Sequence, residues 1–303
     1  MEPLRPMSTG ELLDRTFALY RKNFLLFLGI AVVTHAVYLG YELLTIKSAP
    51  VMRGGKLLAS YYLSIALAFV FMTVVLTISQ AATVKAVAAV HLDQTTSVWA
   101  AYGSVRRRIF SVFGVLLFVF LIAGLITGVL LVILGIGLGL VIVALGSAAR
   151  SQTASLILGF AFLLSALAIF VALYARYALA IQACIVENLG SWASMKRSVQ
   201  LSKEGRLRIA IVYVLFLILS WIAALCLESL GRMAATPWHN QIASIVVVQV
   251  AGFVAGSLTD PLATIGISLL YYDQRVRKEA FDLQLMMSSL DAAPGPVVAQ
   301  LEV

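Results

Sequence analysis

The amino-acid sequence predicts an all-α, polytopic integral membrane protein, a bundle of six transmembrane helices with three short interfacial helices on the cytoplasmic side. Hydrophobic residues occupy 61% of the 303 positions and charged residues only 12%, whereas about a quarter of the residues in soluble proteins are charged. The 22 basic and 14 acidic residues are too few to cover the surface of a water-soluble protein of this length. A large soluble catalytic domain is therefore excluded.

The predicted spans are the apolar runs between charged residues, because about 20 helical residues cross the hydrocarbon core. The runs of sufficient length are 24–44, 57–84, 109–175, 209–227 and 242–272, of which 109–175 holds the third and fourth spans. The 41 uncharged residues between Arg108 and Arg150 are roughly twice what one crossing needs. We assign one crossing to them. The sequence leaves open whether this is one long helix or a helix broken near Gly135, Gly137 and Gly139.

The distribution of basic residues predicts the orientation. With six spans, 17 of the 22 lysines and arginines fall on one side of the membrane and 5 on the other. By the positive-inside rule both termini then lie in the cytoplasm, and we expect a multi-pass protein of a bacterial cytoplasmic (inner) membrane. The net charge of +8 indicates contact with anionic lipid headgroups. No nucleic acid is expected as a partner, because no basic stretch accompanies a soluble nucleic-acid-reading module.

Three segments, 8–24, 96–110 and 190–207, share one pattern: a capping-type start, a short amphipathic helix, a basic cluster and then a span. We interpret them as the starts of three pseudo-repeats, each an interfacial helix followed by two spans. The alternative is that the likeness reflects only a shared need for basic residues where helices enter from the cytoplasm. The expected boundaries are 8–92, 93–187 and 188–285 within a single membrane domain, 1–285, and a flexible cytoplasmic tail at 286–303.

The short amphipathic helices are expected to lie parallel to the membrane, in the headgroup layer. In this arrangement Trp99 and Trp192 face hydrocarbon, and Arg107 and Arg197 face water. A sharper interpretation makes these helices a headgroup-binding surface, and the alternative is ordinary anchoring. The candidate headgroup contacts are Arg106, Arg107, Arg108, Lys196, Arg197 and Lys203.

Ionisable groups within the spans are costly, so each is expected to have a partner in the bundle. Asp260, Arg176 and Lys85 all lie toward the cytoplasmic ends of spans. We expect Asp260 to pair with Arg176, whose depth nearly matches, in preference to Lys85. Alternatively, Asp260 caps a new helical segment that begins at Pro261. For His35 the sequence favours a neutral ring hydrogen-bonded to another helix over a proton relay.

No catalytic, cofactor-binding or metal-binding residues are expected. His35, His91 and His239 fall in three different compartments, and the chain has no HExxH or GxSxG motif. Cys184 and Cys226 lie in apolar surroundings without a paired spacing. The sequence thus predicts a protein that is not an enzyme and that needs no cofactor.

Two segments, GELLDRTFALYRKNF near the start and YYDQRVRKEAFD at 271–282, resemble those of a known family. The second segment is a tail motif, whose matching residues are Tyr271, Tyr272, Asp273, Arg275, Arg277, Glu279, Phe281 and Asp282. Glu187, Ser198 and Leu201 add to the likeness. Across essentially the whole chain, the sequence resembles the glycerophosphoryl diester phosphodiesterase membrane domain family.

The resemblance implies a stand-alone multi-span bundle. In that family the phosphodiesterase chemistry belongs to a separate soluble barrel. A barrel of roughly 250 residues does not fit into the short segments that flank the predicted spans. The resemblance therefore supplies no catalytic residue.

Three functions remain, in order of preference. The first is a non-enzymatic accessory, scaffold or lipid-sensing module, which uses the interfacial helices and the tail motif to dock membrane lipids, a protein partner or a second copy of the chain. The second is a transporter or channel for a small solute or lipid headgroup, supported by the pseudo-repeats and the intramembrane charges. The third is a membrane-embedded lipid phosphodiesterase, for which the sequence offers no convergent acid, base and nucleophile.

A reporter that is active only outside the cytoplasm tests the predicted topology when it is fused after Val303. Because 17 basic residues fall on the side of the termini, the fusion is expected to be inactive. The same reporter inserted at Pro50, in the loop after the first span, is expected to be active and serves as the positive control. Activity of the Val303 fusion would contradict the six-span arrangement.

Overall fold

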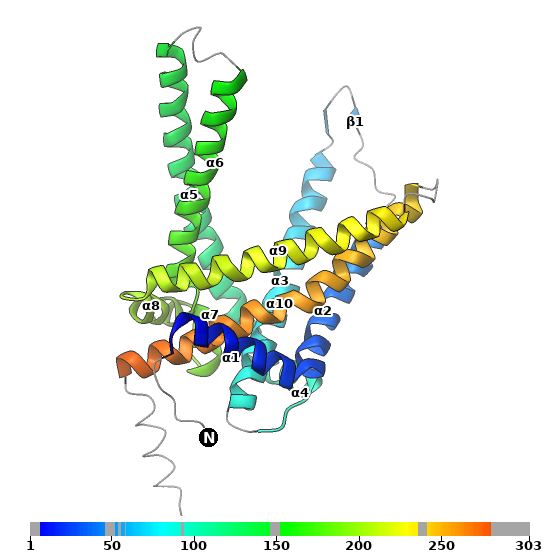
Figure 1. Cartoon of the computed structure of the whole chain (residues 1–303), viewed down its shortest axis with the longest axis vertical. Helices are drawn as coiled ribbons and strands as arrows, with labels where there is room; N and C mark the ends of the chain where they lie inside the picture. The colour runs from blue at the N-terminus through cyan, green and yellow to red at the C-terminus, as the bar shows by residue number, and fades with distance from the viewer. Residues whose placement is uncertain are drawn as a thin grey trace, which may run out of the picture.

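The structure, a computed structural model, describes residues 7–45, 52–53, 56–57, 59–91, 94–145, 152–235 and 241–279. It is an all-α helical bundle (Figure 1). One two-residue antiparallel ribbon, β1 (Met52–Arg53) with β2 (Lys56–Leu57), follows the first long helix. The expected tail at 286–303 lies outside the described residues, as do Phe281 and Asp282 of the tail motif.

Six of the described helices are long and apolar enough to span a membrane, which confirms the predicted multi-pass bundle. They are α2 (Phe24–Thr45), α3 (Ala59–His91), α5 (Ile109–Leu145), α6 (Gln152–Tyr177), α9 (Arg206–Ala235) and α10 (Gln241–Glu279). The short helices are α1 (Thr9–Lys22), α4 (Val98–Val105), the 3-10 turn η1 (Arg106–Arg108), α7 (Ala180–Val186) and α8 (Ser191–Ser202). Helices α1, α4 and α8 each precede two of the long helices, whereas the short helix α7 has no counterpart in the expected pattern. The repeats themselves stay a prediction.

Helix α5 answers the question that the sequence left open, because it runs unbroken through Gly135, Gly137 and Gly139. Its 37 residues extend about 55 Å at 1.5 Å per residue, beyond a hydrocarbon core of about 30 Å. Helix α5 therefore either crosses the bilayer at a tilt or projects from it.

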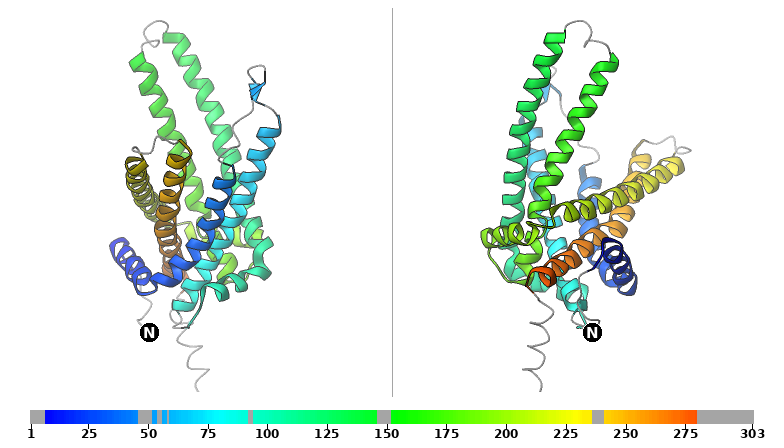
Figure 2. Two further views of the ribbon diagram at one scale, coloured as in Figure 1. Left: turned by 90° about the vertical axis from the view of Figure 1, so that its right-hand side faces the viewer. Right: turned by 60° about the vertical axis from the view of Figure 1, so that its left-hand side comes forward.

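The long helices other than α3 form two arms that diverge from a common base, and α3 lies between the arms, in contact with α2, α5 and α10. Helices α5 and α6 make one hairpin, and α9 packs along α10 in the other arm, with α2 against α10. Figures 1 and 2 show the arms separating toward the end of the molecule that carries β1. The short helices α1, α4, α7 and α8, with η1, gather at the opposite end, and we call this region the basic layer.

Local sequence signals explain where the helices of the basic layer begin. Ser8 and Glu11 form the capping box expected from their spacing: the Ser8 hydroxyl accepts from the Glu11 amide at 3.2 Å, and the Glu11 carboxylate accepts from the Ser8 amide at 3.3 Å. The Ser97 hydroxyl accepts from the Ala100 amide at 3.2 Å at the start of α4. Gly190 precedes α8 in an extended conformation. The three short helices expected from the sequence are therefore present.

Helix α10 continues through Pro261, so the alternative in which Asp260 caps a separate segment is wrong. Proline has no amide hydrogen, and the Ser257 carbonyl therefore loses its usual partner within the helix. The carbonyl of the following residue, Leu258, accepts a hydrogen bond from the Tyr20 hydroxyl at 3.0 Å. This contact ties α1 to the proline-containing turn of α10.

The buried core lies where α3, α7, α9 and α10 meet, next to the basic layer. Its fully buried side chains include Val84, Val87, Ile185, Ile209, Ile265 and Leu269. The close approach of α2 to α10 depends on Gly256, because a Cβ atom there would overlap the ring of His35. A glycine at this position lets a polar ring from one spanning helix reach across the face of another.

Candidate functional site

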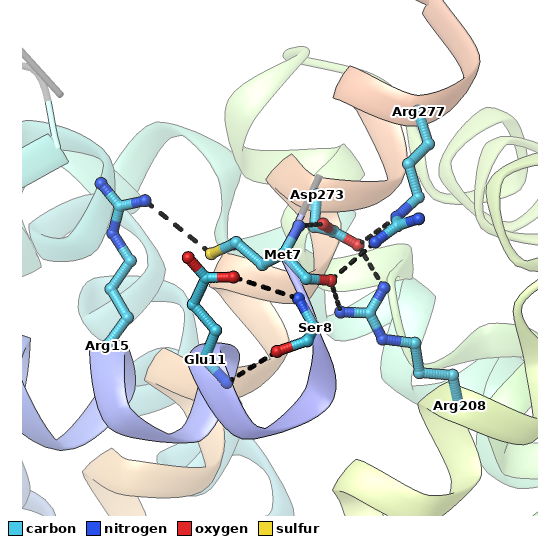
Figure 3. Close-up of polar contacts among 7 residues, drawn as sticks. All are labelled: Met7, Ser8, Glu11, Arg15, Arg208, Asp273 and Arg277. Carbon is cyan, nitrogen blue, oxygen red and sulfur yellow. Dashed lines mark hydrogen bonds and ion pairs between the residues drawn. The ribbon is translucent and has the colours of Figure 1, made fainter. Parts of the chain in front are cut away.

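The tail motif forms a buried polar cluster at the end of α10. The Asp273 side chain is fully buried and accepts hydrogen bonds from the Met7 amide at 2.7 Å, from Arg208 at 2.6 Å and from Arg277 at 2.9 Å. Arg208 and Arg277 also donate to the Met7 carbonyl, at 2.7 and 2.6 Å. Figure 3 shows both guanidinium groups converging on Asp273 and on the backbone before α1. This Asp273 cluster joins the start of the described chain to α9 and α10.

A second cluster surrounds Glu187, the residue that follows α7. Its carboxylate accepts from Arg197 on α8 at 2.9 and 3.0 Å and from the Tyr271 hydroxyl at 2.5 Å. Glu279 completes the set by pairing with Arg197 at 2.5 Å and with Arg275 at 3.0 Å. Burial works against the charged form of Arg197, but hydrogen bonds to the two carboxylates outweigh it and raise the pKa of the guanidinium above its ordinary value.

The Glu187 cluster corrects one expectation from the sequence. Arg197 was expected to face water as a headgroup contact, yet its side chain is only 22% exposed and is engaged by two carboxylates. The order of apolar and charged residues along a single helix cannot show that acidic partners arrive from the end of α7 and from α10. Arg197 therefore holds α8 against the bundle instead of reaching for lipid.

The other candidate headgroup contacts divide into two groups. Four of them are exposed, as contact with lipid headgroups requires: Arg106, Arg107, Lys196 and Lys203. Arg108 instead donates to the Asn188 carbonyl at 2.8 Å. Asn188 has a left-handed backbone with φ of 55°, a conformation that asparagine tolerates better than most residues.

Side chains of α8 form hydrogen bonds to the backbone where the chain is interrupted between α6 and α7. The Ser198 and Ser202 hydroxyls donate to the Arg176 carbonyl at 3.1 and 3.2 Å, and Ser198 accepts from the Leu179 amide at 3.2 Å. These bonds satisfy backbone groups that the interrupted helix leaves without partners. Ser198, one of the residues behind the family resemblance, thus has a structural role at this junction.

A groove of about 350 Å³ lies between α5, α6 and α8. Arg176 and Lys196 flank it, and Ile122 and Trp192 supply apolar walls. The Lys196 ammonium lies 5.7 Å from the centre of the Trp192 ring. Trp192 is 57% exposed, and Trp99 on α4 is 75% exposed, consistent with the outward direction expected for both. We call this site the basic groove.

A separate cavity of about 230 Å³ lies among the spanning helices at the base of the two arms. Every helix around it contributes a polar or aromatic side chain. These include His35, Gln80, Tyr174, Gln182, Tyr213 and Asp260. We call this site the central cavity.

In the central cavity the partner of Asp260 is His35, at 2.8 Å, and the expected pair with Arg176 is wrong. Matching depth along two helices does not show whether they are neighbours. Helix α10 packs against α9 and α2, whereas the Arg176 side chain lines the basic groove beside α8. Lys85, the second candidate partner of Asp260, forms no ion pair with any described residue. For His35, the hydrogen bond to another helix that the sequence favoured is present.

Several residues of these sites were not predicted from the sequence. Gln182 is a single amide side chain in an apolar run of the sequence, and this isolation was the one feature that could have marked it as a site residue. Tyr174 and Tyr213 are typical interfacial aromatics, and only the three-dimensional arrangement stacks their rings, with centroids 4.2 Å apart. Among the described residues no group of three histidine, cysteine or acidic side chains is arranged to hold a metal ion.

Comparisons with protein-family models, with curated proteins and with solved structures return no match.

Replacing Asp273 with asparagine tests the Asp273 cluster. The change leaves two guanidinium groups without their buried carboxylate, and we expect it to lower the free energy of unfolding by about 3 to 5 kcal/mol. Thermal unfolding in detergent, followed by circular dichroism, measures the effect. Glu204→Gln removes the same charge from a side chain that is 82% exposed and is expected to be nearly neutral. Equal unfolding midpoints for the two variants would argue against a stabilising cluster.

Proposed function

We propose that this chain is a non-enzymatic, lipid-sensing module of a bacterial inner membrane, which recognises anionic phospholipid headgroups on its cytoplasmic face. The observation that carries the proposal is the basic groove, in which Arg176 and Lys196 flank the apolar Ile122 and Trp192. The proposed orientation, with both termini inside, places this groove at the leaflet where anionic lipids meet basic residues.

The chemistry of the basic groove matches a lipid phosphate better than a free solute. The planar guanidinium of Arg176 can donate two parallel hydrogen bonds to phosphate oxygens, and the Lys196 ammonium adds a compact charge. Tryptophan is favoured at membrane interfaces because it joins an apolar ring to a polar N–H group. A volume of about 350 Å³ corresponds to roughly a dozen water molecules at about 30 Å³ each, enough for a phosphate and its glycerol.

Helix α8 connects headgroup binding to the rest of the fold. Lys196 points into the basic groove, whereas the next residue, Arg197, is bound by Glu187 and Glu279. A displacement of α8 on lipid binding therefore acts on the Glu187 cluster and on the end of α10. This connection supports sensing of lipid state, in addition to anchoring, as the role of the groove.

Membership of the glycerophosphoryl diester phosphodiesterase membrane domain family remains part of this proposal. Its support is the tail motif, whose described residues contribute Tyr271, Asp273, Arg275, Arg277 and Glu279 to the two clusters. A motif that builds buried polar contacts is under strong physical constraint, since removing one partner leaves an uncompensated charge.

A second candidate function is a transporter for a small solute. The central cavity favours it, because polar side chains within spanning helices commonly mark a substrate pathway. Uptake into vesicles distinguishes this function from lipid sensing, which requires no flux.

Lipid selectivity tests the proposed function. Native mass spectrometry of the purified protein with mixed phosphatidylglycerol and phosphatidylcholine is expected to show preferential retention of phosphatidylglycerol. The double variant Arg176→Gln, Lys196→Gln is expected to lose roughly 30-fold in affinity, since two interfacial basic residues are worth about 1 kcal/mol each.

The control is Arg232→Gln, which removes a charge from a side chain that is 68% exposed. Arg232 lies in the last turn of α9. This variant is expected to retain the preference. Equal retention of phosphatidylglycerol by the double variant and the control would refute the proposal.

A further inference from the structure

We infer that the segment directly after α10, residues 280–287, occupies the basic groove when no lipid is bound there. The sequence of this segment is AFDLQLMM, and it lies outside the described residues. It contains Phe281 and Asp282, the two residues of the tail motif that follow α10. The inference rests on the proposed function of the groove and deepens it by naming the regulation of the same site.

The basic groove has no carboxylate among the described residues of its wall. Arg176 and Lys196 are exposed, and each lies over an aromatic ring, 5.8 Å from the centre of Tyr177 and 5.7 Å from the centre of Trp192. Neither cation forms an ion pair with a described residue. Arg197, the residue next to Lys196, is in contrast bound by two carboxylates. Two cations that share a groove repel each other, so an acidic occupant is favoured.

The end of α10 is fixed beside the basic groove. Glu279, the last residue of α10, pairs with Arg197 at 2.5 Å. Lys278 donates to the Gln200 carbonyl at 3.2 Å, and Gln200 lines the groove. The chain therefore leaves α10 close to the rim of the groove.

The segment needs only its first residues to reach the groove. Asp282 follows Glu279 by three residues, and three extended residues cover about 10 Å. Lys196 directly precedes Arg197 on α8 and points about a quarter of a turn away from it. The Asp282 carboxylate can therefore meet the cations of the groove while Glu279 keeps its contact with Arg197.

The composition of the segment matches the walls of the groove. Its single charged residue, Asp282, is surrounded by six apolar residues and one glutamine. The groove likewise combines two cations with apolar walls, which are formed by Ile122, Trp192, Met195 and Val199. A lipid also offers one anionic group next to apolar chains, so lipid and segment compete. The segment of the same chain is favoured over that of a second copy, because a short tether gives it a high effective concentration.

Cross-linking of the full-length protein tests the docking. The changes Leu283→Cys in the segment and Val199→Cys in the groove wall supply two thiols. Cys226→Ser removes the exposed native thiol, whereas Cys184 is buried. A short bismaleimide is expected to join the two thiols within one chain in detergent, and added phosphatidylglycerol is expected to lower the yield several-fold. Failure to cross-link, or cross-linking between two chains, would overturn the inference.

Two charge variants of this cysteine-containing chain show whether the carboxylate directs the docking. Asp282→Asn is expected to lower the cross-linking yield about fivefold, as expected for loss of a partly exposed ion pair. It is also expected to raise the affinity for phosphatidylglycerol in native mass spectrometry, because the groove is then free more often. The matched control, Asp291→Asn, removes the same charge further along the tail and is expected to leave both quantities unchanged. Equal yields for the two variants would reject the docking.

The outcomes separate this inference from the proposed function. If phosphatidylglycerol does not weaken a cross-link that depends on Asp282, the docking stands and lipid recognition at the groove fails. If lipid selectivity depends on Arg176 and Lys196 but no cross-link forms, the proposed function stands and the docking fails.

Discussion

The buried carboxylate of Asp273 is the contact on which the basic layer depends. A fully buried charge is tolerated only with close partners of opposite sign, and Asp273 has Arg208, Arg277 and the Met7 amide. These partners come from α9, from α10 itself and from the segment before α1, so one carboxylate holds together parts of the chain that lie more than 200 residues apart. The Glu187 cluster extends the same principle to α7 and α8.

The buried polar groups of this protein lie in two kinds of surroundings, the charged clusters at the end of α10 and the central cavity. In the Asp273 and Glu187 clusters, arginine and carboxylate side chains pair with one another, and Nε of Arg208 is a buried nitrogen without a hydrogen-bond partner among the described residues. At the central cavity, Asp260 pairs with His35 through one carboxylate oxygen, and the buried Gln182 Oε1 atom has no hydrogen-bond partner among the described residues. Paired charged clusters of this kind favour a single rigid arrangement. We therefore assign a structural role to the described residues of the tail motif.

Much of the fold follows from the sequence because hydrophobicity and helix caps are local properties. The six spans and the start of α1 at Ser8 needed only runs of apolar residues and one capping spacing. The unbroken course of α5 through Gly135 could not be deduced, since glycine weakens a helix without ending it. The long α10 likewise accommodates Pro261, where the sequence also allowed a new helical segment.

The polar partners were less predictable because they depend on which helices are neighbours. The Asp260–Arg176 pair was inferred from depth alone, whereas packing brings α2 to α10 and so brings His35 to Asp260. Arg197 was assigned to water from the pattern of its own helix, yet Glu187 and Glu279 reach it from other elements. The basic groove was found in part, since Lys196 was expected at a headgroup surface and Arg176 was not.

The break between α6 and α7 connects the two proposed sites. Ser198 on α8 donates to the Arg176 carbonyl and accepts from the Leu179 amide, so α8 fixes the geometry of the break. The groove residue Arg176 lies just before this break on α6, and the cavity residue Gln182 lies just after it on α7. Because α8 is bonded to the backbone at Arg176 and Leu179, a change in the position of α8 acts on the segment that joins the two sites.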